Sequence, residues 1–200
     1  GNLFNLAQTV IIGGAMAFTF LEAEGRAIGA SKVERVAKQK GKDVDLHAVA
    51  KDLLAKARSN GVTIILPVDH SCATGFKNEA PFFTTTADIP DGYMGLDFGP
   101  KTIDLCKKAI ESSRTCVWNG PVGVFEIPNF STGSTALASA IANNKEMLSI
   151  VGGGETAAAT QAFKHKITHT STGGGATLEL LEGKALPGLV ALTSKVTSKI

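Results

Sequence analysis

The sequence has little of what several common functional signatures require. Its three cysteines, Cys72, Cys106 and Cys116, are widely spaced and include no C-x-x-C pair, which argues against a zinc knuckle or a disulfide framework. No apolar run approaches the roughly 20 residues of a membrane span. Twenty basic and 18 acidic residues give a net charge of +2 without a basic patch. We therefore expect neither a membrane nor a nucleic acid as partner.

What the sequence does contain is a repeated order of short apolar runs and helical stretches. The apolar runs predict buried strands at residues 9–12, 62–66, 115–118, 148–151 and 167–171. The helical pattern predicts helices at about residues 16–24, 45–59, 100–113, 134–143, 155–164 and 176–182. Prolines and glycines between residues 68 and 98 indicate an irregular excursion with short strands. The order predicts a Rossmann-like three-layer α/β domain, with a parallel sheet and helices on both faces.

Three of the predicted strands end in glycines directly before a helix. These turns are Gly13-Gly14, Gly152-Gly153-Gly154 and Gly173-Gly174-Gly175. A helix N-terminus presents unpaired N–H groups, and glycine lets a ligand approach the backbone closely. Such turns bind anions, most often phosphate, and in open α/β sheets they gather at one edge. The same glycines could instead serve tight connections, although three together favour the phosphate site.

The class of phosphate ligand stays open at this point. No Walker A loop and no G-x-S-x-G elbow occurs, whereas residues 152–157 fit the dinucleotide pattern G-x-G-x-x-[GA]. That match is weak, because the acidic residue at the expected spacing, Glu179, falls within a predicted helix. Glu155 either holds Mg²⁺ against a phosphate or only complements the helix dipole. Glu126 either accepts hydrogen bonds from a ribose or is a solvated loop residue.

Several longer segments together resemble the phosphoglycerate kinase family, specifically its C-terminal nucleotide-binding domain. The resemblance runs from about residue 8 to residue 192. The segments that carry it are residues 11–20, 66–69, 92–100, 117–126, 152–157 and 169–188. The family transfers a phosphoryl group reversibly between 1,3-bisphosphoglycerate and Mg-ADP, giving 3-phosphoglycerate and Mg-ATP. Phosphoryl transfer depends mostly on positioning and charge stabilisation, in keeping with the glycine turns.

The resemblance implies a role for each matching residue. The adenine pocket would be lined by Gly13, Gly14, Gly95, Leu96 and Val124. Pro121 and Glu126 would contact the ribose, Asn119, Gly154 and Thr156 would reach the phosphates, and Glu155 would hold Mg²⁺. Gly120, Val122, Phe125 and Gly153 would complete the nucleotide site. The catalytic residues would be Gly154, Gly173, Gly174 and Gly175, the last three facing the transferring phosphoryl group.

The sequence departs from the family pattern in three respects. Ala15 stands where the family usually has glycine, and Glu155 where it usually has aspartate. The family's N-terminal domain, which binds phosphoglycerate, and a lysine-containing phosphate loop have no counterpart here. We therefore expect residues 1–200 to form one nucleotide-binding domain that is inactive alone. The alternatives are a non-catalytic nucleotide-binding module and, much less favoured, a dinucleotide-dependent dehydrogenase.

Two further expectations concern the setting of the protein. The full-length family protein is expected to be a monomer in the cytoplasm, with ADP or ATP as its partner. The tripeptide Ser198-Lys199-Ile200 is close to the S-K-L peroxisomal address. It is either an ordinary polar tail or a signal for a peroxisome-like organelle.

Overall fold

The structure is a computed structural model that describes residues 2–39, 41–188 and 190. The α-helices are α1 (Gly14–Ala23), α2 (Leu46–Ser59), α3 (Pro100–Glu111), α4 (Thr132–Asn143), α5 (Gly154–Ala159) and α6 (Gly174–Leu181). The strands are β1 (Thr9–Ile11), β2 (Val36–Gln39), β3 (Lys42–Asp45), β4 (Thr63–Ile65), β5 (His70–Ala73), β6 (Phe82–Phe83), β7 (Met94–Phe98), β8 (Thr115–Asn119), β9 (Leu148–Gly152) and β10 (His169–Ser171). Short 3₁₀ helices are η1 (Asn2–Asn5), η2 (Pro128–Phe130) and η3 (Gln161–Lys166).

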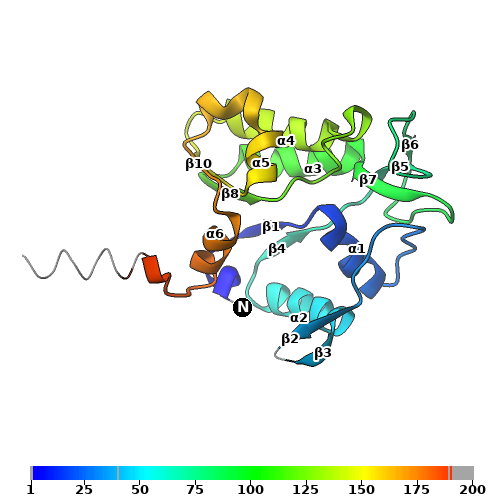
Figure 1. Ribbon diagram of the computed structural model, residues 1–200, viewed down its shortest axis with the longest axis horizontal. Helices are drawn as coiled ribbons and strands as arrows, with labels where there is room; N and C mark the ends of the chain where they lie inside the picture. Colours follow the sequence, from blue (N-terminus) through cyan, green and yellow to red (C-terminus); the bar gives the residue numbers. More distant parts are fainter. Residues whose placement is uncertain (1, 40, 189, 191–200) are drawn as a thin grey trace, which may run out of the picture.

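The five predicted buried strands are present and pair in parallel. β1 pairs with β4 in one ladder, and β9 lies between β8 and β10 in another. The alternating strand-and-helix order thus gives the expected α/β architecture (Figure 1). The sequence reasoning is confirmed for this class of fold, with the parallel pairing divided between two ladders.

Helices cover both faces of the β1–β4 ladder, which follows from the alternation of side chains along a strand. Ile11 and Ile65 pack against the buried cluster that holds α3 and α4 side chains. Ile12 and Ile64 pack instead against the cluster of α1 and α2. Figure 1 shows β1 and β4 between these two helix pairs. The predicted three layers are therefore present around this ladder.

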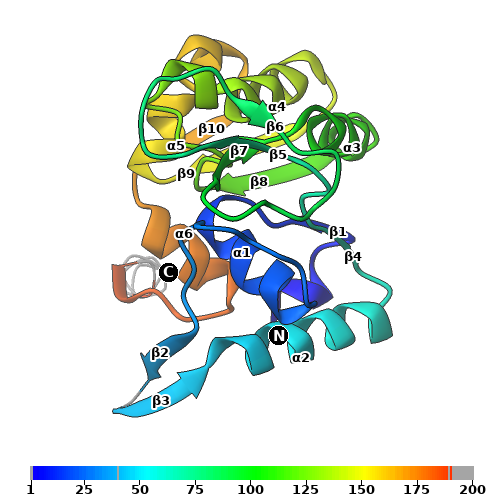
Figure 2. The ribbon, with the colours of Figure 1, turned by 90° about the vertical axis from the view of Figure 1, so that its right-hand side faces the viewer.

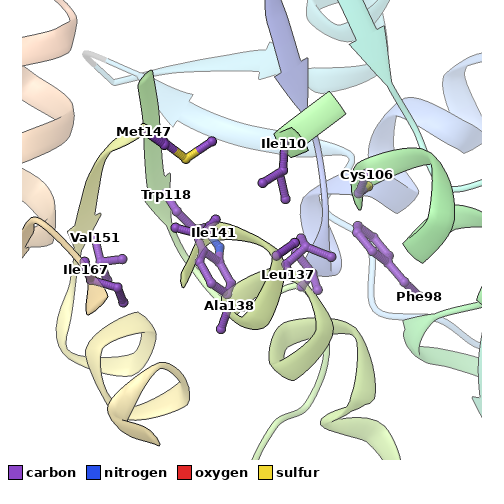
Figure 3. Packing of buried hydrophobic residues seen from close by; sticks show 12 residues of the cluster. Phe98, Cys106, Ile110, Trp118, Leu137, Ala138, Ile141, Met147, Val151 and Ile167 are labelled. Atoms are coloured by element: carbon purple, nitrogen blue, oxygen red, sulfur yellow. The ribbon is translucent and has the colours of Figure 1, made fainter. Parts of the chain in front are cut away.

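The largest buried cluster fills the space between β8, β9, α3 and α4. Trp118, the last residue of the predicted buried strand 115–118, is only 9% exposed and lies in this cluster. Figure 3 shows its indole ring beside Leu137, Ala138 and Ile141 of α4. Burial of this apolar surface contributes about 25 cal/mol per Å². The cluster fixes β8, so that the loop after it starts from a rigid point.

Two antiparallel units supplement the parallel strands. β5 pairs with β6 and β7, within the stretch predicted to hold short strands. β2 and β3 form a hairpin that the sequence reasoning missed, because its Lys- and Asp-rich segment lacks apolar alternation. Figure 2 shows this hairpin extending away from the parallel strands near the start of α2. Neither unit includes any of the three glycine turns that precede helices.

The predicted helix at 155–164 differs in detail from the structure. α5 ends at Ala159, and η3 continues from Gln161. The Thr160 hydroxyl donates to the carbonyl of Thr156 at 2.8 Å, a local bond that competes with helix continuation.

Ser198-Lys199-Ile200 lies outside the described residues, as does the end of the resemblance. Within the described residues, no helix is long and apolar enough to cross a bilayer.

Candidate functional site

Three helices away from the glycine turns have their N-termini capped by aspartate. Asp45 accepts hydrogen bonds from the first turn of α2, at 2.9 and 3.2 Å. The carboxylate of Asp69 accepts from the N–H groups of Lys101 and Thr102 in α3, at 2.9 and 2.8 Å. Asp97 accepts from Gly133 in α4 at 2.7 Å. These carboxylates satisfy N–H groups that have no partner within the helix.

The three helices that follow glycine turns have no such cap. α1, α5 and α6 begin after Gly13, Gly153 and Gly173, respectively, none of which has a side chain. Across the described part of the chain, no side-chain oxygen accepts from their first-turn N–H groups. Gly14 and Gly174 donate their N–H groups to the carbonyls of Val122 and Thr172, respectively. The other first-turn donors and the positive end of each helix dipole are left for an external anion. This contrast between the two sets of helices makes the glycine turns the candidate site for an anion.

Two of the glycine turns pack directly against each other. A Cβ at Gly174 would lie 2.9 Å from Cα of Gly153, so the backbones meet where no side chain fits. Gly153 has φ +94°, a conformation that favours glycine, and its N–H donates to the Ser171 carbonyl at 2.9 Å. The starts of α5 and α6 therefore face the same space.

That space is a hollow of about 270 Å³. Its lining contains most of the residues expected at the phosphates, together with Thr172, which the sequence reasoning did not include. The lining residues are Asn119, Gly120, Gly153, Gly154, Glu155, Thr156, Thr172 and Gly174. Thr172 directly follows β10, and its place at a strand's carboxyl end was the signal that could have found it. Gly173 and Gly175 lie beside Gly174 but are not among the lining residues.

The segment after β8 connects this hollow to the other glycine turn. The Asn119 side-chain amide donates to the Gly174 carbonyl at 3.0 Å, and the Gly120 N–H donates to the Thr156 hydroxyl at 2.7 Å. Farther along, the Val122 carbonyl accepts from the N–H of Gly14 at 3.3 Å. Residues 119–122 thus contact the start of α1, α5 and α6. All three glycine turns meet around this one segment.

The residues expected at the adenine and ribose lie beyond this segment. Val124 donates its N–H to the Leu96 carbonyl at 2.8 Å, which joins the loop to β7. A Cβ at Gly13 would lie 2.8 Å from the Phe98 ring and 2.9 Å from Val122. A Cβ at Gly95 would lie 2.6 Å from the Phe18 ring. Both glycines therefore permit close packing of α1, β7 and the loop.

Side chains in this second group differ in exposure. Leu96 is buried against Ala73 and Phe130, with Val124 partly buried beside it. Pro121 and Phe125 are half-buried, and Glu126 is exposed. The group is continuous with the hollow through residues 119–124. The structure thus brings the predicted residues together in two adjoining parts, a hollow at α5 and α6 and a loop against α1 and β7.

Glu155 is the acidic residue of the hollow. It is exposed in the first turn of α5, and the lining contains no other carboxylate and no lysine or arginine. Across the described residues, no group of three or more His, Cys, Asp or Glu side chains could hold a metal ion. A single carboxylate beside an anion site nevertheless fits Mg²⁺ that is shared with substrate phosphates. The donor set therefore suits an ion that arrives with a nucleotide.

A second, larger groove of about 660 Å³ lies between α3 and α4. Its lining includes Lys107, Glu111, Asn143 and Lys145, near the C-terminal ends of both helices. None of the predicted site residues lines it. Helix C-termini carry partial negative charge, which disfavours a phosphate there. The smaller hollow at the glycine turns is therefore the better candidate for a phosphate site.

Comparisons with known proteins agree with the class that the fold defines, an α/β domain with parallel strands and with glycine turns at its strand ends. Residues 1–184 match the family model of phosphoglycerate kinase. The chain is 50% identical to the phosphoglycerate kinase of Gloeobacter violaceus, over 96% of this chain and 48% of that protein. It is 46% identical to a phosphoglycerate kinase of Leishmania mexicana described as cytosolic, over 97% and 46%, respectively.

A solved structure gives the same result. The phosphoglycerate kinase of Coxiella burnetii superposes with a TM-score of 0.87 at 37% identity, over 97% of this chain and 48% of that one. The chain therefore belongs to the phosphoglycerate kinase family. It spans about half the length of the relatives that it matches.

Proposed function

We propose that this chain is the nucleotide-binding half of a phosphoglycerate kinase, corresponding to the C-terminal domain, and that residues 1–200 form that one domain. In this proposal it binds ADP or ATP with Mg²⁺, while phosphoglycerate binds to another part of the full-length protein. The reaction is reversible phosphoryl transfer between 1,3-bisphosphoglycerate and Mg-ADP. We place the full-length protein in the cytoplasm as a monomer.

The observation that carries the proposal is the division of the helices into two sets. Aspartates cap α2, α3 and α4, whereas α1, α5 and α6 begin at glycine turns with no side-chain cap among the described residues. The uncapped set converges on residues 119–122. A nucleotide presents an anionic phosphate chain at one end and a flat base at the other. The hollow suits the phosphate chain, and the adjoining loop suits the base.

Each part of the site has a distinct task in this proposal. The first-turn N–H groups of α5 and α6 bind the phosphate oxygens and hold the transferred group in line. Charge that develops during transfer is stabilised by these preorganised dipoles, which need little rearrangement. The Gly13-Gly14 turn and the loop through Val124 hold the base and ribose. Asn119 and Thr156 position the glycine turns through the bonds to Gly174 and Gly120.

Mg²⁺ completes the charge balance of the proposed site. When bound, it neutralises the phosphate oxygens and orients them for displacement. Glu155 is the residue that would hold it, directly or through water. The lining of the hollow has no lysine or arginine, so no cationic side chain of this lining faces the phosphates. Nucleotide affinity should consequently depend strongly on the metal.

Calorimetric titration of ADP into this chain, with and without Mg²⁺, tests the proposal. Saturable binding that Mg²⁺ strengthens is the expected result. Absence of binding by a sample that circular dichroism shows to be folded would contradict it. A coupled assay provides a second test. The chain alone is expected to give no phosphoryl transfer to or from phosphoglycerate, and turnover by the pure chain would contradict the assignment as a half-site.

A further inference from the structure

The loop that joins the two parts of the site rests on a buried polar layer that no sequence motif indicated. The Ser134 hydroxyl, in the first turn of α4, accepts from the Val122 N–H at 3.1 Å. Ser134 is only 1% exposed, so water does not replace this acceptor readily. The neighbouring Gly133 N–H donates to Asp97. α4 thus contacts the loop on one side and β7 on the other.

Asp97 lies where the loop, β7 and α4 meet. One carboxylate oxygen accepts from the Phe98 N–H at 2.9 Å and the other from the Gly133 N–H at 2.7 Å. A Cβ at either Gly123 or Gly133 would overlap this carboxylate, so the loop backbone and α4 pack directly against it. The residue Asp97 is only 4% exposed. Its position is therefore fixed by packing from both sides.

The loop is held at Val122 by Ser134, at Gly123 by packing against Asp97, and at Val124 by the hydrogen bond to Leu96. Its conformation therefore depends on these contacts. We propose that Asp97 and Ser134 are positioning residues for nucleotide binding, which hold residues 122–124 in the form that meets the α1 glycine turn. This inference rests on the proposed function. Neither residue lines the phosphate hollow, so both act through the loop rather than by touching phosphate.

Asp69 provides a matched control within the same fold. It is 1% exposed, and its two carboxylate oxygens accept from N–H groups at the start of α3, as those of Asp97 accept from Phe98 and Gly133. Asp69 packs against Gly99 and bonds Thr102, not the 122–124 loop. In either aspartate, replacement by asparagine turns one acceptor into an N–H₂ donor that faces a backbone N–H. Both substitutions therefore damage a helix cap, but only D97N disturbs the loop.

The test compares D97N, S134A and D69N by ADP titration with Mg²⁺ and by amide hydrogen exchange. D97N and S134A are expected to weaken ADP binding about tenfold, because the loss of one buried hydrogen bond has an effect of about this size. Both should speed exchange at Val122 and Val124. D69N should lower the melting temperature but leave the ADP dissociation constant and the exchange of these two amides unchanged.

The outcomes separate this proposal from the proposed function. Equal loss of affinity in D97N and D69N, or unchanged exchange at Val122 and Val124 in D97N and S134A, would overturn the positioning role. If the wild-type chain binds no ADP, the nucleotide assignment fails, while exchange still decides whether Asp97 and Ser134 hold the loop. If D97N does not fold, S134A against D69N decides both affinity and exchange.

Discussion

Two buried titratable side chains, one on β5 and one on its partner strand β7, predict opposite dependences of stability on pH. Burial raises the pKa of Asp97 from 3.8 to about 7, against the lowering effect of hydrogen bonds from the backbone of Gly133, Phe98 and Thr132. Burial lowers the pKa of His70 from 6.5 to about 4, although the Ala87 carbonyl, Asp69 and Asp88 favour its charged form. His70 is 1% exposed and Asp97 is 4% exposed, so solvent screens neither strongly.

The signs follow from proton linkage. Between about pH 4 and pH 7 the folded state keeps a proton on Asp97 that the unfolded state has lost, so this contribution falls as pH rises. Between about pH 4 and pH 6.5 the unfolded state protonates His70 and the folded state does not, so this contribution rises with pH. At 1.36 kcal/mol per pKa unit, the contributions are about 4 kcal/mol for Asp97 and about 3 kcal/mol for His70. They nearly cancel in the wild-type chain.

Urea unfolding at a series of pH values, with D97N and H70Q each compared with the wild type, measures the two contributions separately. Other ionisable groups are common to the proteins and cancel in the differences. Relative to that of the wild type, the free energy of unfolding of D97N should increase by about 4 kcal/mol as pH rises from 4 to 7. That of H70Q should decrease, relative to the wild type, by about 3 kcal/mol as pH rises from 4 to 6.5. Differences that do not vary with pH, or that vary with the same sign, would refute the reasoning.

Two further predictions concern the hollow. Gly174→Ala should weaken ADP binding by about tenfold or more, because its Cβ would lie 2.9 Å from the Gly153 backbone and overpacking costs about 1–3 kcal/mol. Gly188→Ala, where a Cβ meets nothing within 4 Å and which lies outside both parts of the site, is the control, and calorimetry showing equal affinities for the two variants would contradict the close approach. Glu155→Gln should abolish the Mg²⁺ enhancement of ADP binding, whereas Glu155→Asp should retain it. Persistence of the full enhancement in Glu155→Gln would remove Glu155 from the metal site.

The sequence carried enough information for the parallel strands and for the helices that follow them. Their apolar runs and glycine or proline boundaries are local signals, as at Asn60-Gly61, where α2 ends and Gly61 has φ +68°. The β2–β3 hairpin was missed because its charged residues form little core, although its strands pair in a regular antiparallel register from Val36 with Asp45 to Gln39 with Lys42. Local pattern predicts an element only when that element buries an apolar face.

The candidate site likewise contains some residues that local sequence signals predicted and others that they did not. The glycine turns at Gly153 and Gly174 were found, because their backbone chemistry can be read from short segments. Asp97 and Ser134 were not, since their contacts with Gly133 and Val122 join segments separated by 36 and 12 residues, respectively. A buried aspartate and serine have no local signature of a supporting role. Only the fold reveals that the loop rests on them.

The central claim is that the phosphates of a metal nucleotide bind where α5 and α6 begin. Titration of the folded chain with ADP and Mn²⁺, followed by paramagnetic broadening of backbone amide resonances, tests this position directly, with Mg²⁺ as the diamagnetic control. The account predicts selective broadening at Gly120, Gly154 and Gly174, while amides of α2 stay sharp. Broadening centred on the α3–α4 groove, or uniform broadening without a centre, would contradict it.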